Sequence, residues 1–324
     1  MGSWPPLLAK AKWPWCPGDC GGNNQNAGGG ERFRPHSILE PLNTNQHHQS
    51  IDTTQKIKAI RFQELHRGPG AFLIPNPWDA GSARILAGLG FAAFATSSAA
   101  SAGVLGRRDG KLTRDEALTH ALVIVEATGL PVAADLEDGF GDDPSIVSET
   151  IRLAADIGLV GGSIEDARPY RDKPIYEIGF ATERVEAAVE AARSLPFPFT
   201  LAARAENFIR GNPNLDDTIK RLVAYEKAGA DVLFAPGLPD LAAVRAVCSA
   251  VSKPVNFAVA GRDRSFSVAE LVDAGVKRIS FAASFYRAAM TGLMDAAREA
   301  QQSGTFTYLD RTLTTQEVNR FFPD

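Results

Sequence analysis

Residues 156–166 read Asp156-Ile157-Gly158-Leu159-Val160-Gly161-Gly162-Ser163-Ile164-Glu165-Asp166 and contain one copy of a pattern that organises most of the chain. The segment opens at the end of an amphipathic stretch, and Gly158 supplies a residue that readily adopts the left-handed conformation that ends a helix. The short run that follows, residues 162–165, predicts a buried strand. Two acidic residues stand where that strand ends.

The same pattern of helix, glycine and apolar run recurs from residue 71 to residue 283. Near-continuously apolar strands that alternate with helices are typical of a parallel sheet covered by helices. We expect strands at residues 72–76, 91–97, 132–137, 162–165, 199–204, 232–236, 255–259 and 278–283. Eight units in about 215 residues favour an α/β fold of the (β/α)8 TIM-barrel type. An open doubly wound sheet is the alternative.

Composition limits the classes of protein to which the chain can belong. Of 324 residues, 44% are hydrophobic and 22% are charged, and the formal net charge is -4. No stretch is apolar for long enough to cross a bilayer, and the acidic balance gives no general attraction to polyanions. We expect no membrane and no nucleic-acid partner. Cys16 and Cys20 lack the second ligand pair of a zinc site, and Cys248 lies on the apolar stripe of a predicted helix. This cysteine usage and the absence of a secretory signal predict a cytoplasmic protein.

Three segments are expected. Residues 1–50 are rich in glycine, proline and polar residues, and they predict a disordered N-terminal extension. Asp52 is a suitable cap for a first helix that runs to about His66. We expect a catalytic barrel domain over residues 51–304 and a C-terminal helical tail over residues 305–324.

Acidic residues gather at the predicted C-terminal ends of strands, where active sites of such barrels lie. Asp135 and Glu137 end the third strand, on one side of it by the two-residue period, and Glu165 and Asp166 end the next. Neighbouring strands lie about 4.8 Å apart, so these carboxylates would share a small volume and repel one another. A hard cation, Mg²⁺ or Mn²⁺, is the simplest neutralising partner. No histidine stands at a strand end, which disfavours zinc. The structural alternative is that each acid caps a helix or pairs with an arginine.

Groups that could bind an anion lie on the same rim. Arg204 ends the fifth predicted strand, and its guanidinium could hold a carboxylate or phosphonate. Pairing with Glu206 or Glu165 is the structural alternative. Ser97 and Ser98 follow the second strand and offer hydroxyls and loop amides. No lysine ends a strand, which disfavours Schiff-base chemistry, and no glycine-rich phosphate cradle is found.

These segments resemble the isocitrate lyase and phosphoenolpyruvate mutase superfamily over about residues 55–305. The resemblance is carried by residues 75–84 and 96–98, by residues 134–141 and 164–166, and by Ala203-Arg204. It implies that Asp135 binds Mg²⁺ directly and that the metal's water ligands are held by Asp109, Glu137 and Glu165. It also implies that the substrate carboxylate is bound by Ser97, Ser98 and Arg204. Family members are homo-oligomers, usually tetramers or dimers of dimers, that exchange a C-terminal helix, which the tail would supply.

The loop after the fourth strand, residues 167–176, differs from the family pattern. It contains neither the Cys and His of the lyases nor the Lys followed by Asn and Ser of the mutases and phosphonopyruvate hydrolases. The sequence therefore does not identify which bond of the substrate is cleaved. We predict a Mg²⁺-dependent lyase, decarboxylase or hydrolase that cleaves a C–C or P–C bond of a small 2-oxo or 2-hydroxy acid through a pyruvate-type enolate. Its candidate catalytic residues are Asp109, Glu137 and Arg204. A non-catalytic oxyacid-binding barrel and a metal-dependent pyruvate aldolase are the alternatives.

Overall fold

The computed structural model describes residues 44–167, 174–261 and 266–322, with side chains from residue 53 onward. The first 43 residues of the predicted N-terminal extension lie outside this range. So does most of the loop after the fourth strand, residues 168–173.

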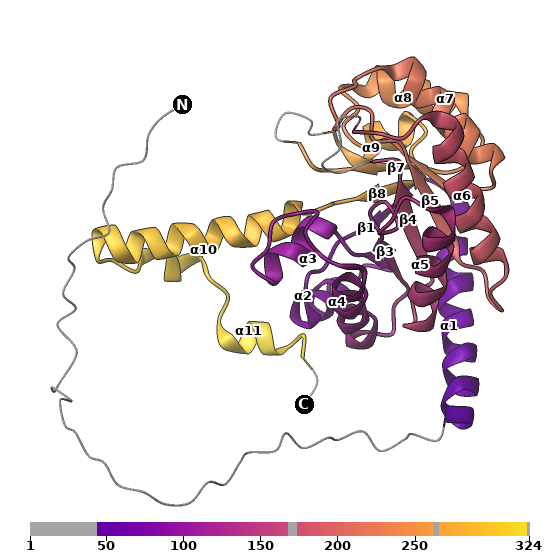
Figure 1. Cartoon of the computed structure of the whole chain (residues 1–324). Coiled ribbons are helices and arrows are strands. Elements are labelled where there is room, and N and C mark those ends of the chain that lie inside the picture. The colour runs from indigo at the N-terminus through magenta and orange to yellow at the C-terminus, as the bar shows by residue number, and fades with distance from the viewer. Residues whose placement is uncertain (1–43, 168–173, 262–265, 323–324) are drawn as a thin grey trace, which may run out of the picture. The chain divides into compact units, whose positions relative to one another are not determined.

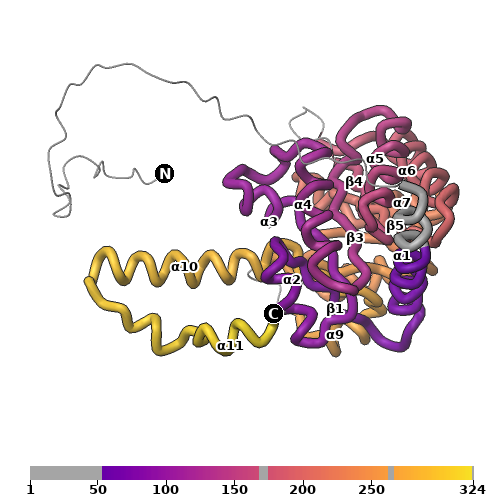
Figure 2. The backbone as a smooth tube through the Cα atoms, turned by 90° about the horizontal axis from the view of Figure 1, so that it is seen from below, coloured from indigo at the N-terminus to yellow at the C-terminus, as the bar shows by residue number. Residues whose placement is uncertain are grey.

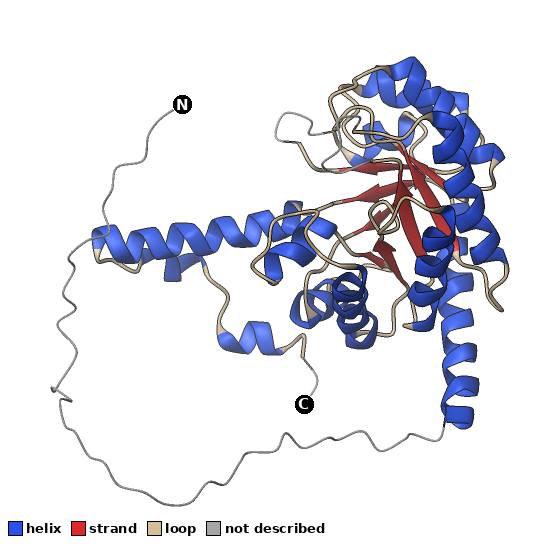
Figure 3. Ribbon diagram, in the orientation of Figure 1, coloured by secondary structure: helices blue, strands red, loops and turns tan. Residues whose placement is uncertain are grey.

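Eight parallel strands form a nearly closed barrel, which confirms the (β/α)8 prediction (Figures 1 and 3). Hydrogen-bonded neighbours follow the order β1-β8-β7-β6-β5-β4-β3-β2. The barrel closes between β1 and β2 where the amide of Ala95 donates to the carbonyl of Pro75 at 3.1 Å. The strands are β1 (Phe72–Ile74), β2 (Phe94–Ala95), β3 (Val132–Asp135), β4 (Gly161–Glu165), β5 (Thr200–Arg204), β6 (Val232–Phe234), β7 (Val255–Ala258) and β8 (Arg278–Ser280).

Helices connect the strands and cover the outside of the barrel (Figure 3). Several begin at a side chain that accepts a hydrogen bond from the first turn, such as Asp79, Thr113 and Asp240. The helices are α1 (Thr44–Arg67), α2 (Ala80–Gly88), α3 (Ser98–Val104), α4 (Arg114–Ala127), α5 (Pro144–Asp156), α6 (Ile178–Arg193), α7 (Leu215–Lys227), α8 (Leu241–Ala250), α9 (Val268–Asp273), α10 (Ser284–Ser303) and α11 (Thr315–Asn319), with a 3₁₀ turn at Thr307–Arg311.

The first helix starts earlier than predicted. Because α1 begins at Thr44, Asp52 lies inside the helix, and the helix takes in the last residues of the segment expected to form the N-terminal extension. The run is polar, which suggested disorder, but it holds no glycine or proline that would break a helix. Farther along, Gln55 donates to the carbonyls of Ala155 and Leu159 at 2.7 and 2.9 Å, which fixes α1 to the end of α5.

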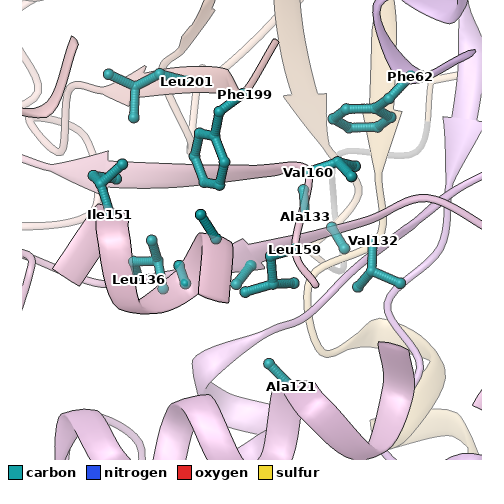
Figure 4. Close-up of a cluster of buried hydrophobic side chains, with 14 of the residues drawn as sticks. Phe62, Ala121, Val132, Ala133, Leu136, Ile151, Leu159, Val160, Phe199 and Leu201 are labelled. Atoms are coloured by element: carbon teal, nitrogen blue, oxygen red, sulfur yellow. The ribbon is translucent and has the colours of Figure 1, made fainter. Parts of the chain in front are cut away.

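Two groups of buried side chains pack between the strands and the helices. The first surrounds β2 to β5 and includes Phe62, Ile151, Leu159 and Leu201 (Figure 4). Phe62 projects from α1 toward Gly161 of β4. Its ring lies so close that it would contact a β-carbon at this position, which glycine lacks. The second group lies between β5 to β8 and helices α6 to α9. Together they fix the ends of the strands that carry the polar residues.

The C-terminal elements differ from the rest because α10 has no buried residue. Leu293 and Leu313 are among the large apolar side chains that it and the following segment leave exposed. The chain turns back after α10 (Figure 2). The Phe321 ring packs directly on Gly88 of α2. Among the described helices, none combines the length and the apolar character needed to span a bilayer.

Candidate active site

A cavity of about 460 Å³ opens at the C-terminal ends of the strands, as expected for this fold. Its two walls differ in chemistry. The wall from β1 to β5 is polar, and the wall from β6 and β7 is mainly apolar, with Phe234, Phe257 and Ala258. The predicted residues that line the cavity are Ser97, Ser98, Asp109, Asp135 and Arg204.

Asp135 lies at the end of β3 and is held in place by its neighbours. Its amide donates to the hydroxyl of Thr96 at 3.0 Å, and its Oδ2 accepts from the amide of Ser98 at 3.1 Å. Its Oδ1 lies 3.6 Å from the Arg204 guanidinium. These contacts join β2, β3 and β5 at one point and leave the carboxylate facing the cavity.

Glu137 lies beside Asp135 but is not among the residues that line the cavity, and it leaves the strand before its predicted end. The strand ends at Asp135, and Glu137 lies in a turn with a left-handed φ of 48°, so the two-residue period of a strand does not place it. Its carbonyl accepts from the amide of Glu165 at 2.9 Å, which joins the turn to β4. Burial, together with the charges of Asp135 and Asp109, raises the pKa of Glu137 to about 8. The predicted repulsion among these acids is therefore present.

Arg204 forms the centre of a buried ion cluster. It lies 3.1 Å from Oε2 of Glu165, and its Nε donates to Glu206, which is fully buried. Arg210 lies 3.1 Å from Glu165 and 3.3 Å from Glu206. Burial raises the pKa of Glu165 well above its usual range. The pairing that stood as the structural alternative for Arg204 is thus formed, while the same guanidinium also faces Asp135.

Of the acids at the two strand ends, Asp166 does not join this cluster. Successive residues of a strand point to opposite sides, so Asp166 faces away from the barrel interior when Glu165 faces inward. Its carboxylate accepts from the hydroxyl of Tyr225 at 2.7 Å, from Arg221 at 3.0 Å and from the amide of Glu206 at 2.8 Å. It fixes the backbone between β4 and β5.

Three supporting residues were not predicted as part of the site. Glu206 and Arg210 hold Arg204 and Glu165, and His120 of α4 joins the loop after β1 to helix α3. The ring of His120 contacts the carbonyl of Trp78 at 2.8 Å and the hydroxyl of Ser101 at 3.0 Å. Burial lowers its pKa. No sequence motif marks these roles, because they depend on contacts between distant segments.

The donor set agrees with Mg²⁺ in kind. The described residues contain no group of three or more His, Cys, Asp or Glu side chains placed to hold a metal among themselves. Mg²⁺ is commonly bound through one or two carboxylates and keeps several waters. Asp135 presents a carboxylate of this kind to the cavity, and the pKa of Glu137 is raised mainly by burial, with the nearby charges of Asp135 and Asp109 adding to the effect. Asp109 stands on an exposed loop at the edge of the cavity.

Known proteins are similar to this chain in sequence. The sequence profile of the phosphoenolpyruvate phosphomutase family matches residues 62–301. The 2-methylisocitrate lyase of Escherichia coli (strain K12) is 30% identical, over 69% of this chain and 78% of that protein. The 2,3-dimethylmalate lyase of Eubacterium barkeri is 32% identical, over 54% of this chain and 62% of that protein.

Solved structures of other proteins have a similar fold. A protein of Burkholderia cenocepacia J2315 described as a lyase or mutase is 51% identical, with a TM-score of 0.82, over 84% of this chain and 98% of that one. Oxaloacetate acetylhydrolase, at 23% identity and a TM-score of 0.74, shares the fold over 82% of this chain and 93% of that one. The chain therefore belongs to the phosphoenolpyruvate phosphomutase family, within the isocitrate lyase and phosphoenolpyruvate mutase superfamily of lyases and mutases.

Proposed function

We propose that this enzyme is a Mg²⁺-dependent lyase, decarboxylase or hydrolase that cleaves a C–C or P–C bond of a small 2-oxo or 2-hydroxy carboxylic acid. The observation that carries the proposal is the meeting of Asp135, Arg204 and the amide of Ser98 in one cavity. A carboxylate ligand, a guanidinium and a loop amide together match a metal-chelating oxyacid. When bound, Mg²⁺ would act as a Lewis acid that stabilises a pyruvate-type enolate.

Each group of the cluster would have a separate role. Asp135 would be the direct metal ligand, and Asp109, Glu137 and Glu165 would hold the metal's waters. Arg204 would bind the substrate carboxylate, and its orientation is supported by Glu206 and Glu165. Ser97 and Ser98 would position the other side of the same carboxylate. Because the site is largely buried, these polar contacts are stronger than they would be in water.

The test is a turnover assay with oxaloacetate, 2-methylisocitrate, 2,3-dimethylmalate and phosphonopyruvate. These compounds cover the types of bond that the names of the relatives indicate. Formation of pyruvate and other 2-oxo acids would be followed with Mg²⁺, with EDTA and in Asp135→Ala. Product that requires both the metal and Asp135 is expected, and the active substrate identifies the bond. Asp273→Asn, which changes an exposed acid, is the matched control.

Two other functions give different results in the same assay. A non-catalytic oxyacid-binding barrel would bind oxalate without turning over any substrate. A metal-dependent pyruvate aldolase would consume pyruvate only when an aldehyde is present. The apolar wall of Phe234, Phe257 and Ala258 gives room for a hydrophobic aldehyde, which is why this alternative is retained.

We also propose a cytoplasmic homo-oligomer. Its support is the exposed apolar surface of α10 and the segment after it, with Leu293, Met294 and Leu313, since such surfaces commonly mark an interface. Sedimentation would show a dimer or a tetramer, and a monomer at micromolar concentration would contradict this part of the proposal.

A further inference from the structure

The inside of the barrel contains an arginine that the proposed chemistry does not use. Arg278 lies at the start of β8, in register with Asn256 of β7 and Phe72 of β1. Residues at matching positions of parallel strands point to the same side, and Arg278 lines the same cavity as Asp135 and Arg204. Barrel interiors are usually filled by bulky branched apolar side chains. A cation at this depth therefore needs an explanation.

Arg278 is buried and has no acidic partner in the part of the chain that the structure describes. Its residue is 6% exposed, and its Nε is buried without a hydrogen-bond partner. None of the described residues forms an ion pair or a hydrogen bond with its guanidinium, whose carbon lies 6.0 Å from the centre of the Phe62 ring. Burial lowers the pKa of Arg278 to about 10, so it stays charged at neutral pH.

The groups around Arg278 do not neutralise it. Burial, together with the charge of Arg278, lowers the pKa of His66 to about 3, so this imidazole is neutral. The side-chain NH₂ group of Asn256 donates to the hydroxyl of Ser280, and its Oδ1 has no hydrogen-bond partner among the described residues. A buried charge without a counter-ion is unfavourable, so an anion that arrives with a ligand is the natural partner of Arg278.

The other arginines of the cavity already have partners. Arg204 is bound to Glu165 and Glu206, and Arg287 at the mouth donates to the carbonyl of Ala260 at 2.6 Å. Among the described residues, the cavity therefore has one arginine on its β8 side, Arg278, that no acidic side chain pairs, and the proposed oxyacid end lies beside Asp135 and Arg204. A ligand with an oxyanion at each end would satisfy both.

We propose that Arg278 forms a second oxyanion subsite, which takes the distal carboxylate of a dicarboxylic substrate whose other end lies at Asp135 and Arg204. The inference rests on the proposed function, since it assumes that the 2-oxo or 2-hydroxy acid end binds there. Arg278 is then a specificity-determining residue, and it selects dicarboxylates over monocarboxylates of equal length.

The test compares ligands that differ only in the distal group. Malate and 2-hydroxybutyrate form one pair, and 2-oxoglutarate and 2-oxopentanoate form a longer pair. Affinities would be measured by calorimetry with Mg²⁺ in the wild type, Arg278→Met, Arg278→Lys and Arg287→Met, with Arg245→Met on the exposed face of α8 as the control. Each titration would be run at low and high chloride.

The wild type should prefer the dicarboxylate of at least one pair by about tenfold or more, as expected for a charge-assisted hydrogen bond. Arg278→Met should erase that preference while oxalate binds as before, and Arg278→Lys should restore part of it. Loss of the preference in Arg287→Met instead, or its persistence in Arg278→Met, would overturn the assignment. Competition by chloride in the wild type alone would show that the subsite takes a free anion and would overturn the dicarboxylate assignment.

Oxalate separates this inference from the proposed function. If oxalate fails to bind the wild type with Mg²⁺, or binds Asp135→Ala equally well, the proposed function fails. If oxalate binds as proposed and the dicarboxylate preference does not depend on Arg278, only the present inference fails. Thermal unfolding adds a second readout, since removing an unpaired buried cation should leave the Tm of Arg278→Met unchanged or higher. A lower Tm together with an unchanged ligand preference would mark Arg278 as a structural residue.

Discussion

Replacement of Asp166 by Asn should strongly destabilise the barrel, because this carboxylate satisfies three buried donors. It accepts from the hydroxyl of Tyr225, from Arg221 and from the amide of Glu206 at 2.7, 3.0 and 2.8 Å. Asn has the same size but offers one acceptor oxygen and an NH₂ group. Whichever way the amide is turned, an N–H group faces a buried donor, and the Arg221 guanidinium loses its counter-charge. Breaking a buried ion pair on one side costs about 3–5 kcal/mol.

That cost corresponds to a fall in Tm of roughly 6–10 °C for a chain of this size. The matched control is Asp273→Asn, since its carboxylate pairs with Arg245 on the surface and its side chain is 74% exposed. Exposed ion pairs contribute about 0–1 kcal/mol, so the control should shift Tm by about 2 °C or less. Differential scanning calorimetry of both variants beside the wild type makes the measurement. Equal shifts in the two variants would refute the reasoning from burial.

Three further outcomes follow from the contacts described. The pKa of His66 is about 3 in the folded chain and near 6.5 when unfolded. Between these values the unfolded state binds one more proton, so the free energy of unfolding decreases as pH falls from about 6.5 toward 3. His66→Gln should remove about 1.4 kcal/mol per pH unit of that dependence, measured by urea titrations. Glu206→Gln removes a charge that orients Arg204, and kcat/KM should fall about tenfold through KM, whereas an unchanged KM would argue against this support. Gly88→Val fills the space of the Phe321 ring and should speed trypsin cleavage of the C-terminal tail, and an unchanged rate would show that this contact does not retain the tail.

The fold could be predicted because its signals are local. Apolar runs and helix-ending glycines recur with every βα unit, and Gly158, Gly229 and Gly275 all adopt the left-handed conformation. The ends of the strands were less predictable, because a residue such as Glu137 leaves the strand to form a turn, and nothing in the local pattern marks that change. The start of α1 was missed because polar composition outweighed the absence of breakers.

The site was predicted in part. Asp135, Glu165 and Arg204 meet as their places at neighbouring strand ends require. Adjacent residues of a strand face opposite ways, and this period continues through Asp166 at the end of β4, whereas it stops at Asp135 in β3. Arg278 could not be singled out, since its inward direction depends on its register with Asn256.

The central claim is that Asp135 is the direct ligand of a divalent metal in an oxyacid site. A crystal grown with Mn²⁺ and oxalate tests it most directly, because Mn²⁺ can be located by its anomalous scattering. The account predicts one anomalous peak about 2.0–2.3 Å from an Asp135 carboxylate oxygen, with oxalate between it and Arg204, and no peak in Asp135→Ala. A peak elsewhere, or one that persists in Asp135→Ala, would contradict it.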